Sequence, residues 1–144
     1  NLIPQYNSGN INTSTISAIE YAVKALNVPH VIILGHSSCG GIRYVYDQCT
    51  KENIEKKFEF IDDWLNIIKP LFYKLPPKIS EEEKITHFEQ DSIEFSLKNL
   101  LSFPFIQKLV LSKKLQIHGI WYNIPKGNIM YISSDKQKFE KIDL

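Results

Sequence analysis

The chain has 144 residues, 43% of them hydrophobic, and a formal net charge of +1 at pH 7. That length and apolar content suit one globular domain, so we expect residues 1–144 to form a single domain. The charges are spread along the chain, and no apolar run reaches the ~20 residues that span a bilayer, so we expect neither a nucleic-acid nor a membrane partner. Two cysteines are too few for a disulfide framework, which favours a cytoplasmic location.

The first half of the sequence has the pattern of an α/β fold. After a loop at residues 1–13, apolar residues recur at helical spacing from about Ser14 to Leu26. Residues 31–34 form a short unbroken apolar run, which predicts a strand buried on both faces. A further helix is predicted from Gly40 to Cys49. The order helix, buried strand, helix is typical of α/β proteins.

The second half of the sequence predicts three helices, two antiparallel strands and a closing helix. In chain order they cover residues 52–69 (ending before Pro70), 80–101, 104–113, 115–124, 128–132 and 134–143.

The chemically distinctive residues are His36 and Cys39, which follow the predicted 31–34 strand. In parallel α/β sheets, ligands gather beyond the carboxyl ends of strands, and zinc accepts a mixture of imidazole and thiolate. Gly40 and Gly41 would leave room for a small ligand beside the backbone amides. On spacing alone, a buried cysteine beside a hydrogen-bonded histidine is the default interpretation, and the position at the end of a strand makes a metal site about equally well supported.

The segment from Leu34 to Gly41 resembles the β-class carbonic anhydrase signature, in which G-H-S-x-C-G-(G/A) follows a buried strand. Further similarities occur in the same order along nearly the whole chain. They involve residues 1–4, the helix before the strand at 14–28, Asn99-Leu100 with Phe103-Pro104, and His118-Gly119 through Tyr122 with Gly127.

The resemblance implies zinc-dependent reversible hydration of CO₂ to bicarbonate, with His36 and Cys39 as metal ligands and Gly40 and Gly41 near the substrate. It also implies a mostly parallel central sheet flanked by helices, with a C-terminal antiparallel strand, and a homodimer or larger homo-oligomer.

The family's remaining zinc ligand and its Asp/Arg dyad belong to a C-x-D-S-R motif that this sequence does not contain. We therefore expect an N-terminally processed or truncated chain that carries no catalytic acid–base residue of its own. We also expect weak zinc binding and an unpaired edge on the 31–34 strand. None of the other candidate ligands fits as a replacement. Cys49 would lie ~15 Å from Cys39 along one helix, and His30, His87 and His118 lie elsewhere in the predicted elements.

Two other functions remain open at this point. A thiol enzyme could use Cys39 as its nucleophile, although Arg43 follows too closely for the cysteine phosphatase pattern, which has five residues between Cys and Arg. A non-catalytic relative could instead serve as an oligomeric assembly or binding module.

Overall fold

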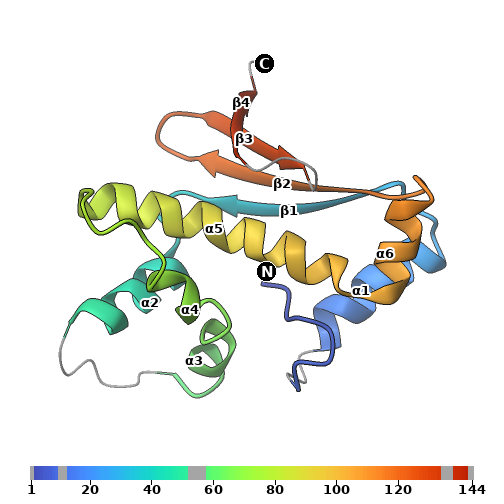
Figure 1. The fold of residues 1–144 in the computed structure, drawn as a ribbon, viewed down its shortest axis with the longest axis horizontal. Helices are drawn as coiled ribbons and strands as arrows, with labels where there is room; N and C mark the ends of the chain where they lie inside the picture. The colour runs from blue at the N-terminus through green and yellow to red at the C-terminus, as the bar shows by residue number, and fades with distance from the viewer. Residues whose placement is uncertain (1, 10–12, 52–57, 134–137, 143–144) are drawn as a thin grey trace.

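The computed structural model describes residues 2–9, 13–51, 58–133 and 138–142. These residues form an α/β fold, as predicted, with a sheet flanked by helices (Figure 1). The helices are α1 (Thr13–Lys24), α2 (Gly40–Thr50), α3 (Phe60–Leu65), α4 (Lys69–Phe72), α5 (Glu81–Leu101) and α6 (Pro104–Leu111). The strands are β1 (His30–His36), β2 (Gln116–Asn123), β3 (Asn128–Ser133) and β4 (Glu140–Ile142).

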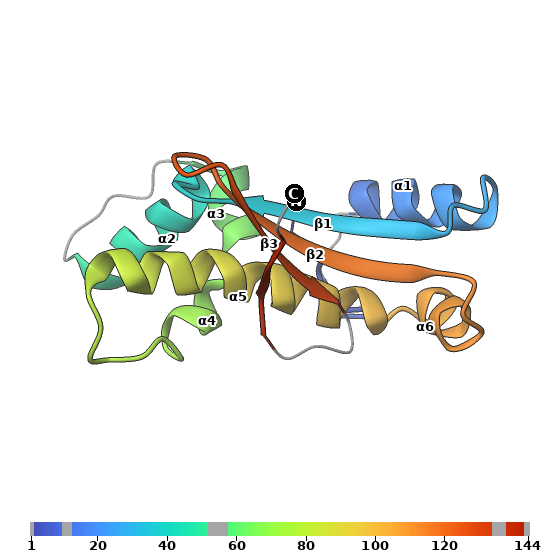
Figure 2. The ribbon, with the colours of Figure 1, turned by 90° about the horizontal axis from the view of Figure 1, so that it is seen from above.

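The sheet is mixed and has the strand order β1-β2-β3-β4. Strands β1 and β2 are parallel, and the pairs β2–β3 and β3–β4 are antiparallel. A parallel pair needs a long crossover, which α2 to α6 supply here. Helices α1 and α6 lie at the end of the sheet where β1 and β2 begin, and α2 to α4 lie toward the opposite end (Figures 1 and 2).

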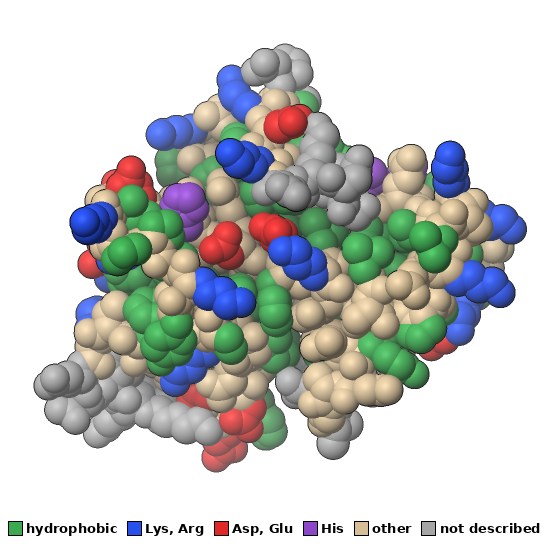
Figure 3. Space-filling view, in the orientation of Figure 1, with side chains coloured by type: hydrophobic (Ala, Val, Ile, Leu, Met, Phe, Trp, Pro, Cys, Tyr) green, Lys and Arg blue, Asp and Glu red, His purple; other side chains and the backbone are tan. Residues whose placement is uncertain are grey.

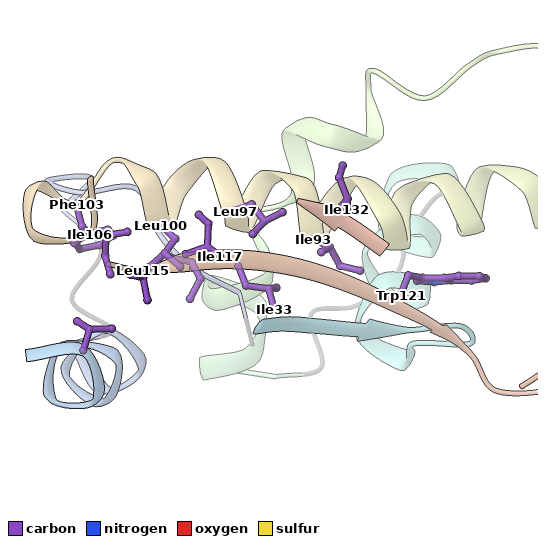
Figure 4. Close-up of a cluster of buried hydrophobic side chains, with 12 residues drawn as sticks. Ile33, Ile93, Leu97, Leu100, Phe103, Ile106, Leu115, Ile117, Trp121 and Ile132 are labelled. Carbon is purple, nitrogen blue, oxygen red and sulfur yellow. The ribbon is translucent and has the colours of Figure 1, made fainter. Parts of the chain in front are cut away.

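The main core lies between α5 and one face of the sheet (Figure 4). Its buried side chains on α5 include Ile93, Leu97 and Leu100, which meet Ile33 of β1 and Ile117 of β2. The repeat of apolar residues along α5 explains why the long helix predicted at 80–101 forms. A capping box of Ser80 and Glu83 begins that helix.

Two glycines let α5 approach the sheet closely. A Cβ at Gly35 of β1 would lie 2.6 Å from Cδ1 of Ile93. A Cβ at Gly119 of β2 would lie 2.6 Å from Cγ2 of Ile132 and 2.8 Å from Cγ2 of Ile93. Because both separations are shorter than real carbon contacts, only glycine allows this packing of Ile93 against two neighbouring strands.

A second core cluster joins α2, α3 and α4 to the N-terminal half of α5. Its buried members are Ile42, Val45, Tyr46, Leu65, Ile68, Leu71 and Phe88. This cluster fixes α2, and therefore the loop that precedes it, against the same helix that covers the sheet.

Two predicted helices differ from the structure. The prediction of a helix at 134–143 is wrong for the part of this segment that the structure describes, because Glu140–Ile142 pairs with β3 as strand β4. Residues 134–137 and 143–144 lie outside the described residues. Pairing with the exposed edge of β3 outweighs the local helical pattern. The 52–69 helix is replaced by α3 and α4, with 52–57 outside the described residues. Helix α4 contains Pro70 in its first turn, where no intrahelical N–H is needed.

The prediction that the 31–34 strand is buried on both faces is also wrong. Ile33 faces α5 and is 7% exposed, whereas Ile32 and Leu34 on the opposite face are 56% and 62% exposed. Within the described residues, β1 is an edge strand that pairs only with β2. An apolar edge of this kind is a surface on which another strand could pair.

The face of the molecule drawn in Figure 3 carries mixed charge. Lysine and arginine side chains are interspersed with acidic ones over the face seen in Figure 3. No helix in the described parts of the chain is long and apolar enough to cross a membrane.

Gly119→Ala should destabilise the fold, because its added methyl group meets Ile132, Ile93 and Leu97 at 3.0 Å or less. Overpacking of this kind costs about 1–3 kcal/mol of unfolding free energy. Gly40→Ala is the matched control, since a Cβ there meets nothing within 4 Å. Equal urea midpoints for the two variants would contradict the account of how α5 packs on the sheet.

The capping box of α5 should make stability pH-dependent. Hydrogen bonds from Ser80 lower the pKa of Glu83 from its ordinary 4.5. A lowered pKa stabilises the folded state above the ordinary pKa, and this contribution is lost as the pH falls through the folded value. Glu83→Gln should therefore lose stability at pH 7, and its difference from the unsubstituted chain should shrink below pH 4.5. Denaturation of Glu82→Gln, which keeps the capping box, supplies the control; a Glu83→Gln difference that stays constant with pH would refute the prediction.

Candidate functional site

The candidate site is the loop between β1 and α2. Strand β1 ends at His36, and Cys39 occupies the N-cap position of α2 with extended backbone angles. Between them, Ser38 adopts a φ of 58°, in the left-handed region that non-glycine residues seldom occupy. This turn places His36 and Cys39 at the carboxyl end of a strand that has a parallel neighbour, as predicted.

Strand β2 holds one side of the loop. The Ser37 amide donates to the Tyr122 carbonyl at 2.9 Å, and the Ile124 amide donates to the Ser37 hydroxyl oxygen at 2.9 Å. Ser37 itself is 9% exposed. The register of β1 on β2 therefore continues past His36 into the loop.

Glu89 of α5 holds the Cys39 end of the loop through a hydrogen bond. Its Oε1 accepts a hydrogen bond from the Cys39 amide at 3.2 Å, and its Oε2 accepts one from the Trp121 indole at 3.1 Å. Glu89 is only 3% exposed. Burial raises the pKa of Glu89, while hydrogen bonds from Cys39, Trp121 and Ser38 and the nearby His36 oppose that rise. One buried carboxylate thus joins α5, β2 and the loop.

Sequence reasoning missed Glu89. The available signal was an acidic residue four positions before Ile93, on the apolar face of the longest predicted helix. A buried carboxylate requires hydrogen-bond donors, so that position points to a polar partner on a neighbouring element.

The orientation of His36 leaves one ring nitrogen available. His36 Nδ1 lies 2.9 Å from the Ser37 carbonyl oxygen, which can only accept a hydrogen bond. Nδ1 therefore carries the proton, and Nε2 of the neutral ring has a free lone pair. Metal-binding histidines commonly hold their second ring nitrogen in this way.

His36 and Cys39 line one cavity of about 350 Å³. Glu89 also lines it, and most of the remaining wall is apolar, including Ile33, Ile42, Leu65 and Ile68. A second, more polar cavity of about 820 Å³ is lined by Ser37, Ser38 and Gly40 of the same loop and shares Cys39 and Glu89 with the first. Cys39 is a free, partly exposed thiol between the two.

The donor types of His36 and Cys39, imidazole nitrogen and thiol sulfur, fit zinc. Among the residues that the structure describes, no group of three His, Cys, Asp or Glu side chains is arranged to hold a metal ion. The two residues are therefore two donors of types that zinc accepts, and their role as ligands stays a prediction.

The other candidate ligands lie away from this loop. Cys49, near the end of α2, packs against the second core cluster, and burial raises the pKa of its thiol. His118 of β2 contacts His30 and Tyr131, and burial, together with the nearby His30, lowers its pKa. His87 is exposed on α5.

The two glycines of the loop differ in their surroundings. A Cβ at Gly40 would meet nothing within 4 Å, so there is open space beside this residue. A Cβ at Gly41 would lie 3.3 Å from Cδ2 of Leu65, so Gly41 mainly allows α2 to pack on α3.

Arg43 does not support the thiol-enzyme alternative. Its guanidinium forms salt bridges at 3.0 Å with Asp47, one turn further along α2, and with Glu81 of α5. A cysteine phosphatase needs its arginine to bind the substrate phosphate, and here the Arg43 guanidinium is already paired with two carboxylates.

Comparisons with known proteins agree with the fold and with the family resemblance of the sequence. A family model described as "Carbonic anhydrase" matches residues 1–129. Beta carbonic anhydrase 3 of Arabidopsis thaliana is 34% identical over 131 residues, which cover 88% of this chain and 50% of the relative. A carbonic anhydrase of Helicobacter pylori is 33% identical, over 99% of this chain and 66% of the relative.

The fold also matches solved structures of β-carbonic anhydrases. The β-carbonic anhydrase CcaA superposes with a TM-score of 0.84 at 25% identity, over 99% of this chain and 63% of that one. A tetrameric β-carbonic anhydrase from Sordaria macrospora gives a TM-score of 0.73 at 28% identity, over 85% of this chain and 61% of that one. The chain spans between half and two thirds of the length of these relatives. Because the family model covers most of the sequence and the fold matches over nearly its whole length, the chain belongs to the β-carbonic anhydrase family.

Proposed function

We propose that this protein catalyses the zinc-dependent, reversible hydration of CO₂ to bicarbonate. The observation that carries the proposal is the position of His36 and Cys39, which line one cavity at the carboxyl end of β1. Membership of the β-carbonic anhydrase family supports the same chemistry.

In this proposal, Nε2 of His36 and Sγ of Cys39 hold the zinc ion. When bound, zinc supplies Lewis acidity and lowers the pKa of coordinated water toward neutrality. The Ser37 carbonyl accepts the Nδ1–H of His36 and restrains the ring, so Nε2 would be the nitrogen that binds the ion.

Glu89 acts as a positioning residue. Its hydrogen bond to the Cys39 amide fixes the backbone from which the thiol projects. The Trp121 indole donates to the second carboxylate oxygen, so Glu89 cannot turn away from the Cys39 amide without also losing this buried hydrogen bond.

The apolar cavity wall suits a small substrate without a net dipole. Ile33, Ile42, Leu65 and Ile68 offer no hydrogen-bonding groups from their side chains, so water competes weakly for this space. Carbon dioxide could therefore occupy it beside His36 and Cys39, and Gly40 leaves open space near the same loop.

We further propose a homodimer or larger homo-oligomer in the cytoplasm. The similar β-carbonic anhydrase of Sordaria macrospora is tetrameric, which supports self-association. The exposed apolar side chains Ile32 and Leu34 on β1 are also compatible with a covered surface in the assembled protein.

Cys39→Ser should lower zinc affinity at least tenfold, because it removes one of the proposed ligands. Cys49→Ser is the matched control, since Cys49 packs among the side chains of α2 to α4. Zinc affinity is measured by competition with a chromogenic chelator. If the two serine variants bind zinc equally, Cys39 is not a ligand.

Glu89→Gln should weaken zinc binding by about tenfold, as expected when a group that orients a ligand is changed. Glutamine keeps the shape of Glu89 but turns an NH₂ group toward either the Cys39 amide or the Trp121 indole, and both of these are donors. Glu94→Gln, on the same helix and paired with Lys98 at the surface, should leave the affinity unchanged. Equal zinc affinities in these two variants would remove Glu89 from the site.

A further inference from the structure

A cluster of three side chains outside the site lies across strands β1, β2 and β3. His30 begins β1, His118 lies on β2, and Tyr131 lies on β3. His30 Nδ1 is 3.0 Å from His118 Nε2, and His118 Nδ1 is 2.9 Å from the Tyr131 hydroxyl. These residues take no part in the proposed hydration reaction.

We propose that His30 and His118 form a second metal site, which binds one divalent late transition-metal ion such as Ni²⁺, Cu²⁺ or Zn²⁺. The ligands are His30 Nδ1 and His118 Nε2. Neutral imidazole is a common ligand for these ions.

The distance between the two nitrogens suits a shared ion. Two imidazole nitrogens bound at about 2.0–2.1 Å to one metal lie about 2.8–3.4 Å apart for angles between about 90° and 110° at the metal. The observed 3.0 Å, which is a hydrogen bond between the two rings when no ion is bound, lies within that range. The tilt of 39° between the two rings keeps them from stacking face to face.

The backbone fixes both ligands before any ion binds. His30 follows Pro29, whose carbonyl accepts the Gln116 amide at 2.9 Å, and the register of β1 on β2 starts at His30 opposite Gln116. Both side chains therefore project from neighbouring parallel strands at set positions. A site whose backbone is already ordered loses less entropy on binding.

Tyr131 orients the His118 ring. When its hydroxyl accepts the Nδ1–H of His118, Nε2 is left with a lone pair that faces His30. His30 is exposed and can move its own proton from Nδ1 to Nε2 by exchange with water. Both rings stay neutral in this rearrangement, and water completes the coordination of the ion.

The second site is separate from the His36–Cys39 loop. His36 lies six positions after His30 along the strand, which corresponds to about 20 Å at ~3.3 Å per residue. One ion cannot bridge the two positions, so the two sites can be tested independently.

Isothermal titration with NiCl₂ tests the proposal in the chain carrying His36→Ala and Cys39→Ser, which removes the first site. We expect saturable binding of about one Ni²⁺ per chain. His30→Ala and His118→Ala should each weaken it at least tenfold, and Tyr131→Phe by about tenfold. His87→Ala, which removes the exposed histidine of α5, should leave it unchanged.

Absence of saturable binding, or equal weakening by His87→Ala and His30→Ala, would overturn the proposal. If circular dichroism shows that His118→Ala does not fold, Ni²⁺ binding by the His30→Ala variant tests the proposal, because His30 is exposed and its replacement should leave the fold intact. In the unsubstituted chain, Ni²⁺ should broaden the proton NMR signals of the His30 and His118 rings at lower concentration than those of His87; the reverse order would also contradict a site between β1 and β2.

Discussion

The hydrogen bonds of the Glu89 carboxylate connect the fold to the candidate metal site. Glu89 comes from the middle of α5, accepts the Cys39 amide with one oxygen and accepts the Trp121 indole with the other. A buried carboxylate without donors would cost several kcal/mol, so these contacts have to be kept whenever the chain is folded. The position of Cys39 is thereby coupled to the packing of α5 against β2.

That coupling depends on how closely α5 approaches the sheet. Gly35 and Gly119 lie on neighbouring strands beneath Ile93, and larger residues there would push the helix outward. Glu89 lies one turn before Ile93, so an outward shift of α5 would lengthen the hydrogen bonds to the loop and to Trp121. The side chain of Ile93 in the core and that of Glu89 at the site therefore depend on the same separation between helix and sheet.

Sequence patterns predicted the parts of this structure that depend on local spacing. The apolar stripe of residues 80–101 gives α5, the run at 31–34 lies within β1, and the position of His36 after that run places it at the carboxyl end of the strand. The family signature from Leu34 to Gly41 identified the loop and is supported by the comparisons. These features are set by residues that lie close together in the sequence.

The parts that sequence did not predict depend on residues far apart. Glu89 contacts a residue 50 positions earlier, and strand β4 forms because β3 offers it an edge. The exposure of Ile32 and Leu34 depends on which elements pack against that face of β1. The apolar run at 31–34 contains no information about those elements. Likewise, His30 and His118 are 88 positions apart and meet only through the parallel register of β1 on β2.

X-ray absorption at the zinc edge, on zinc-loaded protein, tests the central claim most directly. If His36 and Cys39 bind the same ion, the spectrum should contain sulfur at about 2.3 Å together with imidazole nitrogen at about 2.0–2.1 Å. The sulfur contribution should diminish when Cys39 is replaced by serine. A zinc environment made only of nitrogen and oxygen in the unsubstituted protein would contradict the account.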